Sequence, residues 1–186
     1  MEEFLLNNSE FLFTTSWGRA TWAITIIALL ISLAAIGFLL IFGALQLNAP
    51  NNIGTIFISL AVFEIISLAL VAIFAPGHYL LNSSGIKIKR VVGCIDIPVD
   101  SITSVEMMDE SMSKGSIRLM ASGGFFGFFG RFRSPALGAY SVYATRGENL
   151  VLIRRKDAIP IVLSPDDPEG FIEAVNSLLP DSAGSK

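Results

Sequence analysis

The chain has 186 residues, of which 52% are hydrophobic and only 16% are charged, and its mean hydropathy is +0.63. Soluble domains carry about 25% charged residues, so the composition excludes a plain soluble globular protein. The net charge of −3 lacks the basic surplus of a nucleic-acid-binding protein. The single cysteine, Cys94, excludes an intrachain disulfide and a cysteine metal cluster.

Two apolar segments follow an expected N-terminal tail of residues 1–19. Residues 20–45 carry no charge, and residues 53–75 carry only Glu64. As helices these segments would be roughly 39 and 34 Å long, which is enough to cross a hydrocarbon core of about 30 Å. The short uncharged link over residues 46–52 predicts a tight turn between two antiparallel transmembrane helices. The first segment is too long, and its N-terminal flank too acidic, for a signal peptide.

The charges that flank the two segments predict the topology. Arg19 precedes the first segment, Lys87, Lys89 and Arg90 follow the second, and the link has no basic residue. The positive-inside rule therefore places both termini and the C-terminal region on the cytoplasmic side of the cell membrane. Aromatic rings near the ends of the segments suit the membrane interface: Trp17, Trp22, His78 and Tyr79.

Glu64 lies near the middle of the second segment, where a carboxyl group is costly and usually faces a helix partner or water. Three interpretations are open. The side chain could bond to Ser67 or to Thr25 or Ser32 of the neighbouring helix, it could join subunits of an oligomer, or it could belong to a proton or ion pathway.

Residues 76–180 change to the pattern of a small β domain. The alternation of apolar and polar residues over 86–90 and 102–107 is typical of strands, and the whole region predicts about seven short antiparallel strands. Asp167 and Pro168 then form a helix start signal, and apolar residues at helical spacing follow until Pro180. This order predicts a pleckstrin-homology (PH)-like barrel capped by a C-terminal α-helix, with a polar tail over 181–186.

The second half of this region carries a more specific pattern. The chain reads GGFFGFFGRFRSPALGAYSVYAT and later SPDDPEGF, which resembles the prokaryotic membrane-anchored PH-domain family. The matching residues of the first stretch are Gly127, Phe129, Gly130, Ser134, Leu137, Gly138, Tyr143, Ala144 and Thr145. The resemblance implies a PH-like fold and a membrane setting. The family has no settled activity, so no functional residue is carried over.

Residues 122–133 form the segment that most invites a functional interpretation. Five phenylalanines, four glycines and two arginines lie there, but the flanking elements and acidic residue of a dinucleotide-binding loop are missing. One interpretation is a long loop whose rings fold under the barrel. The other is a membrane wedge, in which the aromatic side chains insert at headgroup level while the arginines meet phosphates. The candidate contacts are Phe125, Phe126, Phe128, Phe129, Arg131 and Arg133.

A second basic group, Lys87, Lys89 and Arg90, lies beside the first predicted hairpin, where PH domains of eukaryotes place headgroup-binding residues. The alternative is a solvated strand face. His78 is the only histidine and abuts the membrane, so the nucleophile–base systems of hydrolases have no plausible base in the domain. We expect no enzyme, catalytic residue, metal or cofactor.

Three functions are therefore consistent with the sequence. The first is a membrane protein that presents a cytoplasmic PH-like domain as a binding or assembly module, for a membrane-protein partner or a second copy of itself. The second is a sensor of lipid headgroups that uses the basic and aromatic residues. The third is an accessory subunit of a transport or enzyme complex that acts through Glu64.

Overall fold

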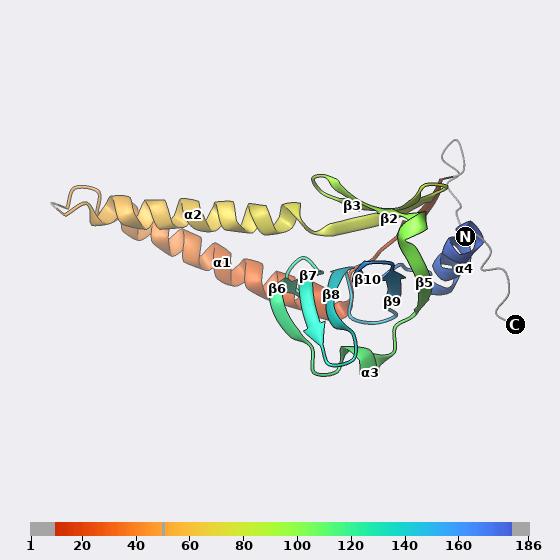
Figure 1. Cartoon of the computed structure of the whole chain (residues 1–186). Coiled ribbons are helices and arrows are strands. Elements are labelled where there is room, and N and C mark those ends of the chain that lie inside the picture. Colours follow the sequence, from red (N-terminus) through yellow and green to blue (C-terminus); the bar gives the residue numbers. More distant parts are fainter. Residues whose placement is uncertain (1–9, 50, 180–186) are drawn as a thin grey trace, which may run out of the picture.

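The computed structural model describes residues 10–49 and 51–179, and it joins two long helices to a domain of two β-sheets (Figure 1). Pro50 of the expected turn and the expected tail over 181–186 lie outside the described residues. The elements, in chain order, are β1 (Phe11–Thr14), α1 (Arg19–Leu45), α2 (Ile53–Ile73), β2 (Pro76–Asn82), β3 (Gly85–Arg90), β4 (Cys94–Pro98), η1 (Val99–Ser101), β5 (Ile102–Met107), α3 (Glu110–Ser113), β6 (Ile117–Gly123), β7 (Phe128–Ser134), β8 (Gly138–Ala144), β9 (Val151–Arg155), β10 (Ala158–Leu163) and α4 (Pro168–Leu178).

The helices α1 and α2 project together from one side of the domain (Figure 1), and both are long and apolar enough to cross a membrane. Only 6% of the most apolar window of each helix is buried, so their side chains do not form the core of a soluble fold. The two helices approach closely near the hairpin end. A Cβ on Gly54 would lie 2.6 Å from the Gly43 carbonyl oxygen, and both glycines are buried.

The strands form one four-stranded sheet, in the order β1-β2-β3-β4, and one six-stranded sheet, in the order β5-β9-β10-β8-β7-β6. All pairs are antiparallel except β8 and β10, which run parallel. The PH-like layout expected from the sequence is confirmed, although the sheets are sandwich-like and do not close into a barrel.

Two strands were not expected. Residues 11–14, placed by the sequence in an N-terminal tail, form β1 and pair with β2 along Phe11↔Leu81 to Thr14↔His78. Residues 128–134, interpreted as loop, form β7 because the glycines permit a tight turn before them. The helical hairpin is therefore inserted between the first and second strands of one sheet.

The main core lies between the two sheets and is closed by α4. Neighbouring side chains on a strand point to opposite faces. Side chains along β9 and β10 therefore point alternately into this core and into a second cluster on the other face of the six-stranded sheet. The largest side chains of the main core are Tyr79, Leu81, Ile86, Ile88, Ile97, Ile153, Leu163 and Phe171, and the second cluster contains Phe132, Tyr140, Val142, Ala144, Leu152 and Val162.

The helix α4 begins as its sequence predicts. The Asp167 side chain accepts a hydrogen bond of 2.9 Å from the backbone N–H of Gly170, and Pro168 occupies the first turn. Phe171 and Val175 then bury their side chains completely. The Phe171 ring meets Phe13 of β1 edge-on, with 5.0 Å between centroids, so α4 and the N-terminal strand stabilise each other.

Candidate functional site at the base of the helices

The turn of the β6–β7 hairpin, residues 124–127, packs against α1. Thr25 of α1 donates from Oγ1 to the Gly124 carbonyl at 3.3 Å and accepts at 3.0 Å from the backbone N–H of Phe126. Gly124 lies so close to α1 that a Cβ there would be 2.7 Å from Ile24 Cδ1. The aromatic segment is thus not a long loop, because it belongs to the β6–β7 hairpin, whose turn contacts α1. Two of its rings, Phe128 and Phe132, pack in the second core cluster.

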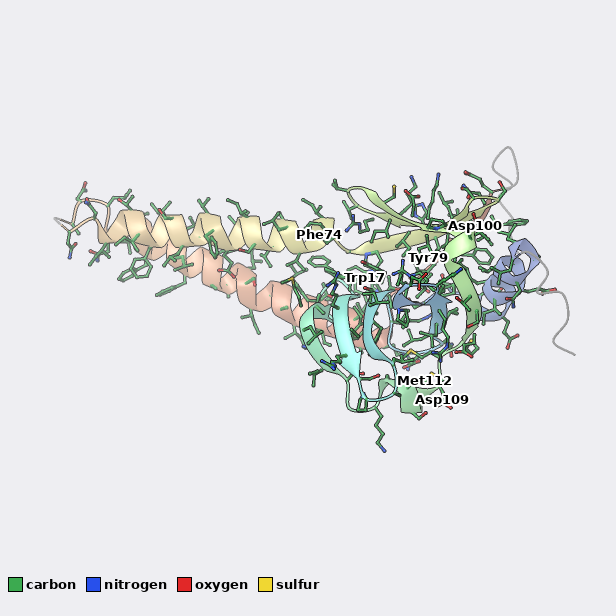
Figure 2. All side chains as sticks on the ribbon, in the orientation of Figure 1. Trp17, Phe74, Tyr79, Asp100, Asp109 and Met112 are labelled. Atoms are coloured by element: carbon green, nitrogen blue, oxygen red, sulfur yellow. The ribbon has the colours of Figure 1, made fainter. Side chains whose placement is uncertain are left out.

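Aromatic rings gather where this turn meets α1. The Trp17 ring lies 5.0 Å from Trp22 and 5.9 Å from Phe126, and Phe125 lies 4.6 Å from Phe126. We call these four residues the aromatic cluster. Figure 2 shows Trp17 at the base of the helices, on the same side of the domain as Phe74. Trp22 remains 54% exposed, so the cluster offers an aromatic surface at that level.

The other candidate phenylalanines lie in β7. Phe128 is half-buried against the second core cluster, and Phe129, also half-buried, stands opposite Tyr143 of β8. Both residues are part of strand β7, whereas Phe125 and Phe126 of the aromatic cluster lie in the turn before it.

Arg131 and Arg133 share one exposed face of the β6–β7 hairpin with two apolar residues. Met120 is opposite Arg131 and Ile117 is opposite Arg133, and cross-strand partners point to the same face. Both arginines are exposed, as are Met120 at 83% and Ile117 at 58%. We call these four residues the basic–apolar face. The β6–β7 hairpin lies on the side of the domain from which α1 and α2 project (Figure 1).

Lys87, Lys89 and Arg90 lie along β3. Lys87 stands opposite Asp96 of β4, and Lys89 lies between His78 and Cys94 of the neighbouring strands. Arg90 ends the strand next to α2, and its guanidinium carbon lies 5.4 Å from the centre of the Phe74 ring. Lys87 and Lys89 therefore point to one face of β3 and Arg90 to the other, where Arg90 contacts the end of α2.

Glu64 is half-buried on α2, and its carboxyl group has no hydrogen-bond partner within residues 10–49 and 51–179. Ser67 donates instead to the Phe63 carbonyl at 2.8 Å, and Thr25 bonds to the β6–β7 turn. Partnering of Glu64 with another chain stays a prediction.

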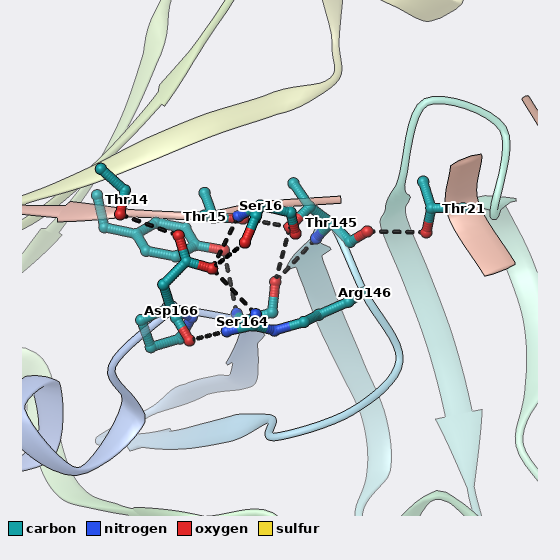
Figure 3. Close-up of polar contacts among 10 residues, drawn as sticks. Thr14, Thr15, Ser16, Thr21, Thr145, Arg146, Ser164 and Asp166 are labelled. Atoms are coloured by element: carbon teal, nitrogen blue, oxygen red, sulfur yellow. Dashed lines mark hydrogen bonds and ion pairs between the residues drawn. The ribbon is translucent and has the colours of Figure 1, made fainter. Parts of the chain in front are cut away.

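A network of polar groups, which no pattern in the sequence indicates, joins the start of α1 to the ends of β8 and β10 (Figure 3). We call it the polar joint, and its residues are Thr14, Thr15, Ser16, Thr21, Tyr79, Thr145, Arg146, Ser164 and Asp166. Thr145 is at its centre. It donates from Oγ1 to the Ser16 carbonyl at 2.7 Å, and its own carbonyl accepts from Thr21 Oγ1 at 2.8 Å. Its backbone N–H donates to Ser164 Oγ at 2.8 Å.

Asp166 is the charged part of the polar joint. It accepts hydrogen bonds of 2.9 Å from Thr14 Oγ1, from the backbone N–H of Ser16 and from Arg146 Nη1. Ser16 Oγ also donates to it. Partial burial works against ionisation, but the hydrogen bonds from Ser16 and Thr14 and the charge of Arg146 together hold the pKa of the Asp166 carboxyl below its usual range.

Tyr79 was expected at a membrane interface, and that prediction is wrong. Its ring is fully buried in the main core, because the OH group finds partners there: it donates to the Tyr143 carbonyl at 2.7 Å and accepts from the Ser164 N–H at 3.1 Å. Burial raises the pKa of this phenol. Tyr79 therefore ties β2 to the polar joint.

The polar groups of the site attach α1 to the domain, and its exposed groups are available to contact another surface. In the described part of the chain, no three His, Cys, Asp or Glu side chains come together in a way that could hold a metal ion. The carboxylate of Asp166 is engaged by hydrogen-bond donors from the N-terminal segment and by Arg146. The exposed groups that could meet a ligand are the aromatic cluster, the basic–apolar face and the end of β3.

Comparison with protein families identifies the domain. A family model described as "Bacterial PH domain" matches residues 77–179, which is more than half of the chain. The chain belongs to this family, and the resemblance seen in the sequence is confirmed. No curated protein and no solved structure matches the chain.

The match begins after α2, so it does not include the residues that complete the polar joint from the N-terminal side. Thr145 and Ser164 lie inside the pattern that carried the resemblance. Their partners Ser16 and Thr21 lie on either side of the start of α1. No local signal links positions that far apart, and only a contact between the two regions could have shown the network.

Proposed function

We propose that this protein is a membrane-anchored binding module whose PH domain lies against the cytoplasmic face of the cell membrane and binds anionic lipid headgroups. The basic–apolar face carries the proposal. Arg131 and Arg133 supply positive charge beside Met120 and Ile117, which combines the electrostatic and apolar terms that drive peripheral binding to membranes.

The attachment of the domain to α1 supports the same function. Thr21 and Thr25 are 0% and 2% exposed, and both bond to the domain. About 20 residues of α1 follow Thr25, which corresponds to roughly 30 Å of helix and to the hydrocarbon thickness. The first turns of α1 would then stay with the domain, and the basic–apolar face would lie at headgroup level.

A labelled full-length chain in vesicles tests the proposal. With Cys94→Ser to remove the native thiol and Met120→Cys to introduce one, an environment-sensitive dye reports contact of the face with lipid. We expect a blue shift of the dye in phosphatidylcholine vesicles that contain phosphatidylglycerol, and a smaller one without it. Each basic residue near an anionic surface contributes about 1 kcal/mol. Replacing Arg131 and Arg133 by Gln should therefore lower the docked-to-undocked ratio roughly 30-fold.

The control removes the same charge elsewhere. Lys114→Gln with Lys156→Gln changes two exposed lysines outside the face, and the lipid dependence should survive. Equal dye spectra with and without phosphatidylglycerol would contradict headgroup binding.

A protein partner is the second candidate, favoured by the free edge of β6. Among residues 10–49 and 51–179 this strand pairs only with β7, and its Leu119 is 52% exposed. An unpaired strand edge can accept a strand from another chain. Photo-crosslinking from position 119 in native membranes, compared with Ser177 on α4, would capture a protein if this function is the correct one, and phospholipid if it is not.

A further inference from the structure

The turn between β3 and β4, residues 91–93, carries two valines that the domain leaves uncovered. Val91 is 70% exposed and Val92 is 59% exposed. Neighbouring apolar side chains of the same hairpin are buried, among them Ile88 and Ile97. A hairpin tip with two adjacent exposed valines, followed by a glycine, needs a covering that the described residues do not provide.

The position of this turn identifies the covering. The Val92 backbone N–H donates to the Ile73 carbonyl, the last residue of α2, at 3.4 Å. Figure 1 shows the β3–β4 hairpin reaching back alongside the end of α2. If α2 crosses the bilayer, the hydrogen bond places the valines where this helix leaves the hydrocarbon.

The charge beside the valines has the sign that a headgroup region requires. Arg90 stacks on Phe74 just after α2, and its Nε is buried without a hydrogen-bond partner among the described residues. Lys89 precedes it on the strand. A half-buried arginine at the end of an apolar helix, with apolar neighbours, suits the phosphate of a phospholipid.

We propose that the β3–β4 turn is a second membrane contact, in which Val91 and Val92 enter the interface and Arg90 binds a lipid phosphate. With the basic–apolar face, it gives the domain two separate contacts on the bilayer and fixes its rotation about α2. The inference rests on the proposed membrane anchoring by α1 and α2, and it adds a contact that the family match and the aromatic segment do not supply.

The test compares four labelled positions in the full-length chain. On a Cys94→Ser background, single cysteines replace Val92, Leu33 in the middle of α1, Ser84 in the β2–β3 turn and Met120. Each labelled chain is reconstituted in phosphatidylcholine–phosphatidylglycerol vesicles. The dye is then quenched either by a lipid that carries a nitroxide on its acyl chain or by iodide in the water.

We expect the dye at positions 33 and 92 to be quenched by the lipid, and the dye at 84 by iodide. A dye at 92 that behaves like the dye at 84, while position 33 is in lipid, overturns the inference. A dye at 33 in water overturns the membrane anchoring itself. A dye at 120 in water, with position 92 in lipid, contradicts the proposed function and leaves the inference standing.

A second experiment tests the apolar contact in a chain that carries no dye. Val91→Asp with Val92→Asp in the unlabelled chain should increase amide hydrogen exchange at residues 90–94 in vesicles. Ser83→Asp with Ser84→Asp changes the opposite turn of β3 by the same charge, and exchange at 90–94 should stay unchanged. Equal exchange in the two variants would overturn the inference.

Discussion

Thr21, in the first turn of α1, donates its hydroxyl hydrogen to the backbone carbonyl of Thr145 at 2.8 Å, at the end of β8. The same carbonyl accepts from the Gly18 N–H at 3.3 Å. A threonine hydroxyl in a helix usually bonds to its own helix, but this one bonds to the domain and is fully buried. The apolar helix α1 and the PH domain are therefore joined here by a buried hydrogen bond, and movement of one must disturb the other.

Removal of the Thr21 hydroxyl should loosen the start of α1. Thr21→Val keeps the shape of the side chain but leaves only the longer bond from Gly18 on the Thr145 carbonyl. A neutral hydrogen bond contributes about 1 kcal/mol, so amide exchange over residues 17–22 should become roughly fivefold faster. Hydrogen-exchange mass spectrometry of the full chain measures this. Thr55→Val, on an exposed part of α2, is the matched control. Equally fast exchange over residues 17–22 in that variant would contradict a specific role of the Thr21 hydroxyl.

Acid should weaken the polar joint through Asp166. The pKa of this carboxyl is lowered in the folded protein, so its contribution to stability is present above the unfolded value of about 3.9. That contribution is lost as the pH falls through the folded pKa. We expect the emission of Trp17, which lies next to Ser16, to change as the pH falls below the unfolded value.

The variant Asp166→Asn assigns this acid transition. The Asn side chain cannot ionise, so the change of Trp17 emission with pH should vanish. At pH 7 this variant should already have a weakened polar joint. Because the side chain is about one-third exposed, solvent screens its ion pair with Arg146, and we expect a loss of roughly 1 kcal/mol. An unchanged acid transition in the variant would assign it to another carboxyl group.

The membrane-type helices and α4 could be predicted from the sequence because their signals are local. An uncharged run such as residues 20–45, or the Asp167–Pro168 start of α4, needs no information from the rest of the chain. The strand over residues 11–14 could not be predicted in this way. Its partner, β2, lies beyond both helices, and a four-residue strand has too little pattern of its own.

The residues of the candidate site also divide into those that have a local signal in the sequence and those that do not. Arg131 and Arg133 were found from composition, and the structure adds that Met120 and Ile117 stand beside them. The composition of the aromatic segment draws attention to it, but its contact with Thr25 depends on a helix about 100 residues earlier. The polar joint escaped notice because threonine and serine are ordinary residues until Thr145 is placed opposite Ser16.

Gly127 of the aromatic segment should tolerate substitution poorly. Its φ is +125°, and a Cβ there would lie 2.9 Å from the Ala144 carbonyl oxygen, with Pro76 also in contact. The positive φ and the short contact would both strain an alanine at this position. We expect Gly127→Ala to lower the free energy of unfolding by about 1–3 kcal/mol. Gly147→Ala is the matched control, since nothing lies within 4 Å of its Cβ position. Equal stability of the two variants in a denaturant titration would show that the turn adapts.

Phe171 should hold the N-terminal strand in place as well as the core. Its ring is fully buried and meets Phe13 at 5.0 Å and Tyr79 at 6.1 Å between centroids. Phe171→Ala leaves a cavity and should cost about 3–5 kcal/mol. Because Phe13 loses its partner, amide exchange should rise more in residues 11–14 than in β9, whose side chains keep their own contacts. Glu173→Ala, exposed on the same helix, controls for changes in α4 itself. Equal acceleration of exchange in β1 and β9 would mean that the core unfolds as one unit, and that Phe171 has no particular role in attaching the strand before α1.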